Sequence, residues 1–163
     1  MMKNQFMKEG TMTDHISTYE EEKQAHTVQK ENIPTSEERS WATIAHLSIL
    51  LSLFTGMLGI IVAFIIYLVY KDKSRYIAYH AAQSAIFQLI VLIGGGFLIT
   101  TAWLVTIPLL FILVGLLLLP FTIIISMLPT ASLIYGVIAA IETSSGKDFK
   151  YWLIGDWMRD IYQ

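Results

Sequence analysis

Two long apolar runs dominate the chain, and a short basic segment separates them. No Asp, Glu, Lys or Arg occurs from Trp41 to Tyr70, and none occurs from Tyr76 to Ile141. Uncharged apolar stretches longer than about 18 residues are typical of membrane helices. A soluble domain would instead need amphipathic helices with charged outer faces. The pattern therefore predicts an all-α integral membrane protein.

The first run is too long for one upright membrane helix. As a single helix, residues 41–70 would measure about 45 Å, whereas the hydrocarbon core of a bilayer is roughly 30 Å thick. Gly56 and Gly59 lie near the centre of the run and favour a turn there. The sequence predicts a short hairpin with arms 41–54 and 60–70. A re-entrant loop and one long tilted helix are the alternatives.

A polar stretch precedes the first run. Thr35 and Glu38 have the spacing of a capping box, which predicts a helix that begins near Ser36. Residues 1–34 are rich in Glu, Lys, Gln and Thr and poor in large apolar side chains, a composition typical of disorder. We expect two domains, a disordered polar tail over 1–34 and a transmembrane helical domain over 35–163.

The second run predicts two long helices within residues 76–141. The first of them should end near Ala102. Thr106 can cap the second, with Pro108 tolerated in its first turn. Kinks are expected near Pro120 and Pro129.

The positions of the basic residues predict the topology. All eleven Lys and Arg lie in the N-terminal stretch, at Lys71, Lys73 and Arg75, or near the C-terminus. Such residues favour the cytoplasmic side of a membrane, so each apolar run should cross an even number of times. The prediction is a four-helix bundle in the cell membrane, multi-pass, with both termini cytoplasmic and the turns near Gly56 and Thr106 outside. A third crossing within the second run would place one basic region outside.

The C-terminal stretch, residues 151–162, has an amphipathic pattern. Helical spacing places Trp152, Trp157, Met158 and Ile161 near one another, while charged residues between them can face water. Such a segment is expected to lie in the membrane interface.

Polar side chains form a stripe at the start of the second run. His80, Gln83, Ser84 and Gln88 fall on one helical face, and His46 lies one turn inside the first membrane helix. Polar groups in hydrocarbon need partners, so the stripe should face other helices or water. It can serve interhelical hydrogen bonding, a substrate or ion path, or a partner-binding face. We take these five residues as the candidate binding site, with a stabilising role for Gln88 and a functional role for His80.

Composition excludes several kinds of function. The chain has no cysteine, so thiolate chemistry is excluded, and its net charge of −2 predicts no nucleic-acid partner. No catalytic set is present, and two membrane histidines without a neighbouring carboxylate predict no metal site and no cofactor. We expect lipids and other membrane subunits, or a second copy, as partners, because small residues recur every four positions and let helices pack closely. These residues are Ala45, Ser48, Ser52 and Gly56 in the first run and Ser132, Gly136 and Ala140 in the second.

Four stretches together resemble a known family. They are residues 41–48 (WATIAHLS), 67–72 (YLVYKD), 79–88 (YHAAQSAIFQ) and 147–152 (KDFKYW). The pattern resembles the small bacterial membrane proteins of unknown function that are related to the membrane subunit of the chloroplast inner-envelope import translocon, the Tic-twenty-like proteins. The resemblance implies a four-helix fold and, through the plant relative, a link to protein translocation.

The expected function follows from these features. We expect a non-enzymatic integral membrane protein that serves as a structural or assembly subunit of a membrane complex, with translocation as the role that the resemblance implies. The alternative is a small channel or transporter that uses the polar stripe at its cytoplasmic end.

Overall fold

A computed structural model describes residues 17–23 and 33–162. The chain divides into two units, Met1–Pro34 and Thr35–Gln163. In the first unit, residues 17–23 are helical, and the expected disorder of the tail over 1–34 stays a prediction. This segment contains Glu20 to Lys23, and straight-chain charged residues favour helix. The rest of the disorder prediction for 1–34 falls almost entirely outside the described residues.

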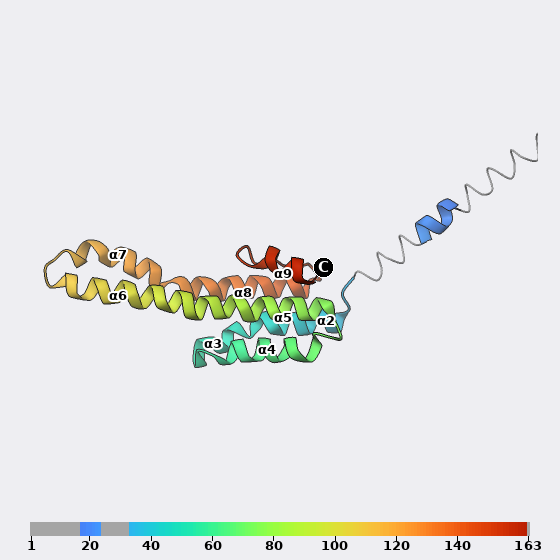
Figure 1. Ribbon diagram of the computed structural model, residues 1–163, viewed down its shortest axis with the longest axis horizontal. Helices are drawn as coiled ribbons and strands as arrows, with labels where there is room; N and C mark the ends of the chain where they lie inside the picture. Colours follow the sequence, from blue (N-terminus) through green and yellow to red (C-terminus); the bar gives the residue numbers. More distant parts are fainter. Residues whose placement is uncertain (1–16, 24–32, 163) are drawn as a thin grey trace, which may run out of the picture. The chain divides into compact units, whose positions relative to one another are not determined.

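In the second unit, every regular element among residues 35–162 is helical (Figure 1). In chain order the elements are α2 (Ser36–Leu47), α3 (Ile49–Thr55), α4 (Leu58–Tyr70), α5 (Arg75–Ile90), the π-helical turn η1 (Val91–Gly95), α6 (Gly96–Leu110), α7 (Gly115–Ser126), α8 (Leu128–Ser144) and α9 (Gly155–Tyr162).

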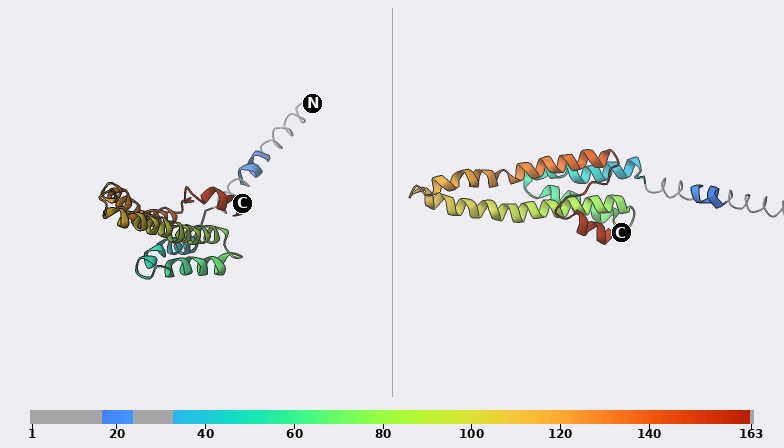
Figure 2. Two further views of the ribbon diagram at one scale, coloured as in Figure 1. Left: turned by 60° about the vertical axis from the view of Figure 1, so that its left-hand side comes forward. Right: turned by 90° about the horizontal axis from the view of Figure 1, so that it is seen from above.

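The hairpin predicted within the first run is present. The capping box is confirmed, because the Glu38 amide donates to Thr35 Oγ1 at 3.2 Å and the Thr35 amide donates to Glu38 Oε2 at 2.8 Å. α3 ends at Gly56, whose φ of 75° lies in the left-handed region that glycine adopts readily. α4 then returns alongside α3, so the single long helix is wrong (Figures 1 and 2).

The helical core consists of α2, α4, α5 and α8. α5 packs against both α4 and α2, and α8 packs against α2 (Figure 2). Alanines fill the contacts: Ala42, Ala45, Ala63, Ala78, Ala81 and Ala139 are all fully buried. Small side chains let the helix axes approach closely, which is the main source of helix association where lipid surrounds a bundle.

The second run turns at a different place from the one predicted. The helical segment that starts with α5 continues through η1 and α6 to Leu110, and the second segment covers residues 115–144. The expected end near Ala102 is therefore wrong. Thr106 caps nothing, because it is buried within α6 and its hydroxyl bonds to that of Thr122 in α7 at 2.7 Å. A partner helix satisfies this hydroxyl, so Thr106 does not have to end a helix.

The two later prolines behave differently from each other. α7 contains Pro120 without ending there. Near Pro129, where a kink was expected, the helix is interrupted: α7 ends at Ser126 and Pro129 lies in the first turn of α8. A proline in the first turn of a helix loses no intrahelical hydrogen bond.

The surface of the second unit is largely apolar. Both long segments, Arg75–Leu110 and Gly115–Ser144, are long and apolar enough to cross a membrane, and α4 is a shorter apolar helix. α6 and α7 extend beyond the turn between α3 and α4, where they pack mainly on each other (Figure 1). Their outward side chains include exposed Phe97, Leu104 and Ile124. Such surfaces suit lipid, and the two long segments are candidate membrane spans.

The C-terminal stretch only partly follows its prediction. Residues 147–154 are largely irregular and return to the core, where Phe149, Tyr151 and Ile154 are buried. In α9, Met158 is buried against Tyr79 and Ala82 of α5 instead of lying with the tryptophans. The prediction that this stretch lies in the membrane interface is therefore wrong for Tyr151, Ile154 and Met158, because these side chains pack in the core. Trp152, Trp157 and Ile161 are exposed, and their place in the membrane interface stays a prediction.

Candidate functional site

The glutamine layer, formed by Ser48, Ser52, Ser84 and Gln88, joins α5 to the α2–α3 arm. Gln88 is buried, and its Nε2 donates to Ser84 Oγ at 3.0 Å and to Ser48 Oγ at 3.1 Å. Its Oε1 accepts from Ser52 Oγ at 3.1 Å. Ser84 Oγ in turn donates to the Ala45 carbonyl at 2.7 Å. Each polar atom of the Gln88 side chain therefore has a partner, as a polar group inside a membrane protein requires.

Gly59 brings α4 into this layer. Ser48 Oγ donates to the Gly59 carbonyl at 2.8 Å. A Cβ atom at residue 59 would overlap the Ser48 carbonyl oxygen and would lie 2.6 Å from Gln88 Oε1. The close contact between α4 and the polar groups therefore requires a glycine. A second close contact occurs at Gly136 of α8, where a Cβ would lie 2.7 Å from Ile49 Cγ2.

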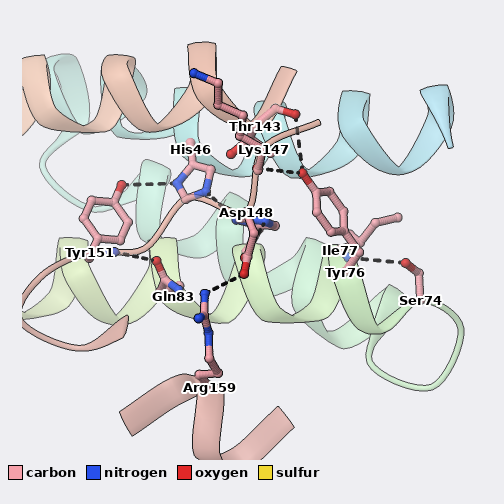
Figure 3. A network of polar contacts seen from close by, with 11 residues as sticks. His46, Ser74, Tyr76, Ile77, Gln83, Thr143, Lys147, Asp148, Tyr151 and Arg159 are labelled. Carbon is pink, nitrogen blue, oxygen red and sulfur yellow. Dashed lines mark hydrogen bonds and ion pairs between the residues drawn. The ribbon is translucent and has the colours of Figure 1, made fainter. Parts of the chain in front are cut away.

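The histidine layer is formed by His46, His80, Gln83, Asp148 and Tyr151, of which Figure 3 labels all but His80. It lies nearer than the glutamine layer to the charged end, which comprises the start of α2, residues 71–75 and the C-terminal segment. His46 Nε2 lies 3.2 Å from His80 Nδ1, and His46 Nδ1 lies 3.2 Å from the Tyr151 hydroxyl. Both histidines are fully buried. Two sets of tautomers satisfy these contacts, one for each direction of donation along the chain Tyr151–His46–His80. When Tyr151 donates to His46 and His46 donates to His80, the remaining His80 proton is on Nε2, the ring nitrogen nearer Asp148.

The outer end of this layer reaches the surface through Asp148. His80 Nε2 lies 3.8 Å from Asp148 Oδ1, beyond hydrogen-bonding distance, while Arg159 of α9 pairs with Asp148 Oδ2 at 2.5 Å (Figure 3). Gln83 Oε1 accepts from the Tyr151 backbone N–H at 3.0 Å. The layer thus connects α2, α5, the segment 147–154 and α9.

Aromatic packing surrounds Tyr151. Its ring stacks on Phe87 with centroids 4.1 Å apart and planes inclined by 12°. Tyr135 and Phe149 contact the same ring edge to face. Burial raises the pKa of Tyr151, so this phenol stays protonated and can donate to His46.

The predicted site residues therefore separate into two layers. Ser84 and Gln88 belong to the glutamine layer, whereas His46, His80 and Gln83 belong to the histidine layer. Sequence reasoning missed Asp148 and Tyr151 as members of the site. Their only signal was a polar and aromatic cluster between α8 and α9, and nothing in its spacing predicts a return to the core.

The basic segment lies at the surface of the charged end. Lys71, Lys73 and Arg75 are exposed, and Lys71 lies 3.9 Å from the Asp72 carboxylate. Ser74 caps α5, because its Oγ accepts from the Ile77 amide at 3.3 Å. All three basic side chains can therefore contact water or lipid headgroups, as a topological signal requires.

Ser74 also links α5 to α2. Its hydroxyl donates to Glu38 Oε1 at 2.6 Å, and this hydrogen bond is the largest of the contributions that lower the pKa of Glu38 below its ordinary value. A carboxylate whose pKa is lower in the folded state stabilises the fold above its unfolded pKa. This contribution is lost as the pH falls through the folded pKa.

We expect Glu38→Gln to reduce the pH dependence of stability between pH 6 and pH 3. Glutamine can still serve in the capping box but cannot titrate. The effect should be at most about 1 kcal/mol, because solvent screens a partly exposed group. Melting temperatures in mild detergent measure it, with Glu37→Gln as the matched control. An unchanged pH profile for Glu38→Gln would contradict the assignment.

A small cavity lies beside the glutamine layer. It is a half-open pocket of about 180 Å³ between the α3–α4 turn, the η1 region and the start of α8. Ser52, Gln88 and Ser132 supply the polar atoms of its lining, and the rest is mainly apolar. The cavity is large enough for a small apolar group, such as part of a lipid chain.

Comparison with known proteins gives one match. The model of the MamF/MmsF family, described as the magnetosome magnetite crystal formation protein family, matches residues 37–158. The matched region runs from the first turn of α2 to Met158 in α9, so it includes both polar layers. Neither a curated protein nor a solved structure shows a significant match.

This match corrects the resemblance drawn from the four short stretches. The family that matches is not the Tic-twenty-like one, so the expected link to protein translocation is wrong. Apolar helices with buried small and polar residues are common to many membrane proteins, and short stretches of this kind do not distinguish one family from another. With the match covering most of its length, the chain belongs to the MamF/MmsF family of magnetosome magnetite crystal formation proteins.

Proposed function

We propose that this protein is a non-enzymatic membrane subunit that takes part in magnetite crystal formation. The family match supplies the process. The observation that carries the structural role is the glutamine layer, in which the polar atoms of Gln88 bond within the protein. Such groups hold helices together and are not available to a substrate. The family's process and the internal use of these groups both favour an assembly role.

The proposed arrangement in the membrane follows the charges. The start of α2, the α4–α5 connection and the C-terminal segment lie at one end of the second unit and carry its charged residues, apart from Glu142 near the end of α8 (Figure 1). We place this end and both termini on the cytoplasmic side. The two helical hairpins, one from α2 to α4 and one from α5 to α8, then enter the bilayer from that side as a four-helix membrane bundle.

Partners of two kinds fit this arrangement. Lipids cover the apolar exterior. Other membrane subunits, or a second copy, can pack on exposed faces such as the one around Gly94, where a Cβ atom would have no neighbour within 4 Å. Trp152 and Trp157 are exposed at the charged end, where tryptophan favours the membrane interface.

The proposal is tested in a magnetite-forming bacterium that lacks its own member of the family. We expect this chain to restore the size of the magnetite crystals, measured by electron microscopy. The matched control is the Gly59→Leu variant, which should fail to assemble because the glutamine layer has no space for a side chain. A wild-type protein that reaches the membrane at normal levels without changing the crystals would overturn the proposal.

The channel or transporter hypothesis has weaker support. Its best feature is the cavity beside Gln88. A path for ions would need polar side chains along the remaining depth of the membrane. Beyond the cavity, α6 and α7 carry mostly apolar residues, and Thr106 and Thr122 bond to each other. Flux of small ions into proteoliposomes would favour this hypothesis over an assembly role.

A further inference from the structure

We propose that the turn between α6 and α7, residues 111–114, ends inside lipid hydrocarbon and does not emerge into water on the far side of the membrane. The second hairpin would then enter and leave through the charged side. This inference goes beyond the proposed function, and it rests on the membrane placement of the fold. It also differs from the expectation that the turn of the second run is outside.

The side chains of the turn are unsuited to water. Between Ile107 and Phe121 there is no polar side chain. Phe111 is 88% exposed and Leu113 is 77% exposed, so the described part of the chain does not cover them. Turns in water are rich in Gly, Asn, Asp and Ser. Burying large apolar side chains contributes about 1.5–3 kcal/mol each, which an aqueous turn would forgo.

Five backbone amides in and beside the turn have partners within the chain, as hydrocarbon requires. The amides of Phe111, Ile112 and Leu113 donate to the carbonyls of residues 108, 109 and 110, at 3.1–3.3 Å. The amides of Leu116 and Leu117 donate to the carbonyls of residues 113 and 114. A chain reversal in lipid must satisfy its backbone groups internally, since no water is available. This turn does so for these amides with short-range hydrogen bonds.

Leu113 supports the same conclusion. Its φ is 64°, and no other described residue apart from glycines has a positive φ. A leucine in this left-handed conformation costs about 1–2 kcal/mol, whereas glycine would adopt it freely. What leucine adds at this place is apolar surface. That surface is favourable only where the surroundings are apolar.

The length of the hairpin decides how it lies in the bilayer. The segment Arg75–Leu110 has 36 residues and measures about 54 Å. Its first residue belongs to the charged end, so an upright hairpin would carry the turn well past a core roughly 30 Å thick. The start of α5 must stay at the charged surface while the turn 111–114 stays within the hydrocarbon. To satisfy both conditions, the helices must tilt or bend to about 55° from the membrane normal.

Single cysteines test the inference, because the chain has none of its own. Leu113→Cys and Ile112→Cys are placed in the turn, and Asp72→Cys at the charged end is the control, since the Asp72 side chain is 85% exposed. The full chain is reconstituted in vesicles, and a membrane-impermeant maleimide is supplied on both sides. Spin labels at the same positions then report the accessibility of dissolved oxygen and of a polar nickel chelate.

We expect no maleimide labelling at residues 112 and 113 in vesicles, full labelling after denaturation, and high accessibility to oxygen but not to nickel. Maleimide labelling in intact vesicles would show that the turn reaches water and would overturn the inference. Low accessibility to both probes would show that protein covers the turn, which would also overturn it. Failure to label Asp72→Cys would instead contradict the proposed membrane arrangement, so the two failures are distinguishable.

Discussion

Replacing Tyr151 by alanine is expected to lower the melting temperature by about 8–30 °C. Tyr151 is 1% exposed and stacks on Phe87. Removing a large buried aromatic ring costs about 3–5 kcal/mol, and His46 would also lose a buried partner, which costs about 1–3 kcal/mol. For a chain of this size, 1 kcal/mol corresponds to roughly 2–4 °C.

Tyr151→Phe is the matched control for this prediction. It keeps the ring and removes only the hydroxyl, so we expect it to cost only the His46 contact, about 1–3 kcal/mol. Thermal unfolding in mild detergent measures both variants. Hydrogen exchange adds a local measurement: in Tyr151→Ala, residues 147–160 should lose protection, because Tyr151 holds this segment in the core. Equal melting temperatures for the two variants would show that packing around the ring is unimportant.

Gly59→Ala is expected to destabilise the fold by about 1–3 kcal/mol or more. The added methyl group would overlap the Ser48 carbonyl and crowd Gln88, and overpacked sites force backbone shifts of this magnitude. A shift would also lengthen the hydrogen bond from Ser48 to the Gly59 carbonyl. The variant should therefore lose both helix packing and part of the glutamine layer.

Gly94→Ala is the control for this second prediction. Gly94 is helical as well, yet a Cβ there would meet no atom within 4 Å. Alanine favours helix over glycine by up to about 1 kcal/mol, so Gly94→Ala should leave stability unchanged or raise it slightly. Unfolding by titrated denaturing detergent gives both values. A Gly59→Ala variant as stable as Gly94→Ala would refute the close contact between α4 and the polar layer.

Part of the site could be predicted from the sequence, because helical spacing alone places Ser84 and Gln88 on one face of α5. Periodicity could not predict which helix faces that stripe. His46 and His80 are 34 residues apart, and they meet only because α2 packs against α5. Asp148 and Tyr151 are further away in the chain and belong to an irregular segment, for which no periodic pattern exists.

Local chemistry by itself determined several features of this protein. The capping box at Thr35, the left-handed turn at Gly56 and the cap at Ser74 each depend on a few neighbouring residues. The uncharged apolar runs likewise determined that the chain is helical and belongs in a membrane, because the cost of placing charges in hydrocarbon is a property of composition.

Only the tertiary structure decided where the second run reverses and where the C-terminal stretch packs. Thr106 and Pro108 carry the local signal of a helix start, yet Thr122 on the facing helix satisfies the Thr106 hydroxyl, and α6 continues to Leu110. Tyr151 follows a polar stretch and is nevertheless buried against Phe87. In both cases a partner distant in sequence supplies the hydrogen bond or the packing surface, and local sequence does not contain that partner.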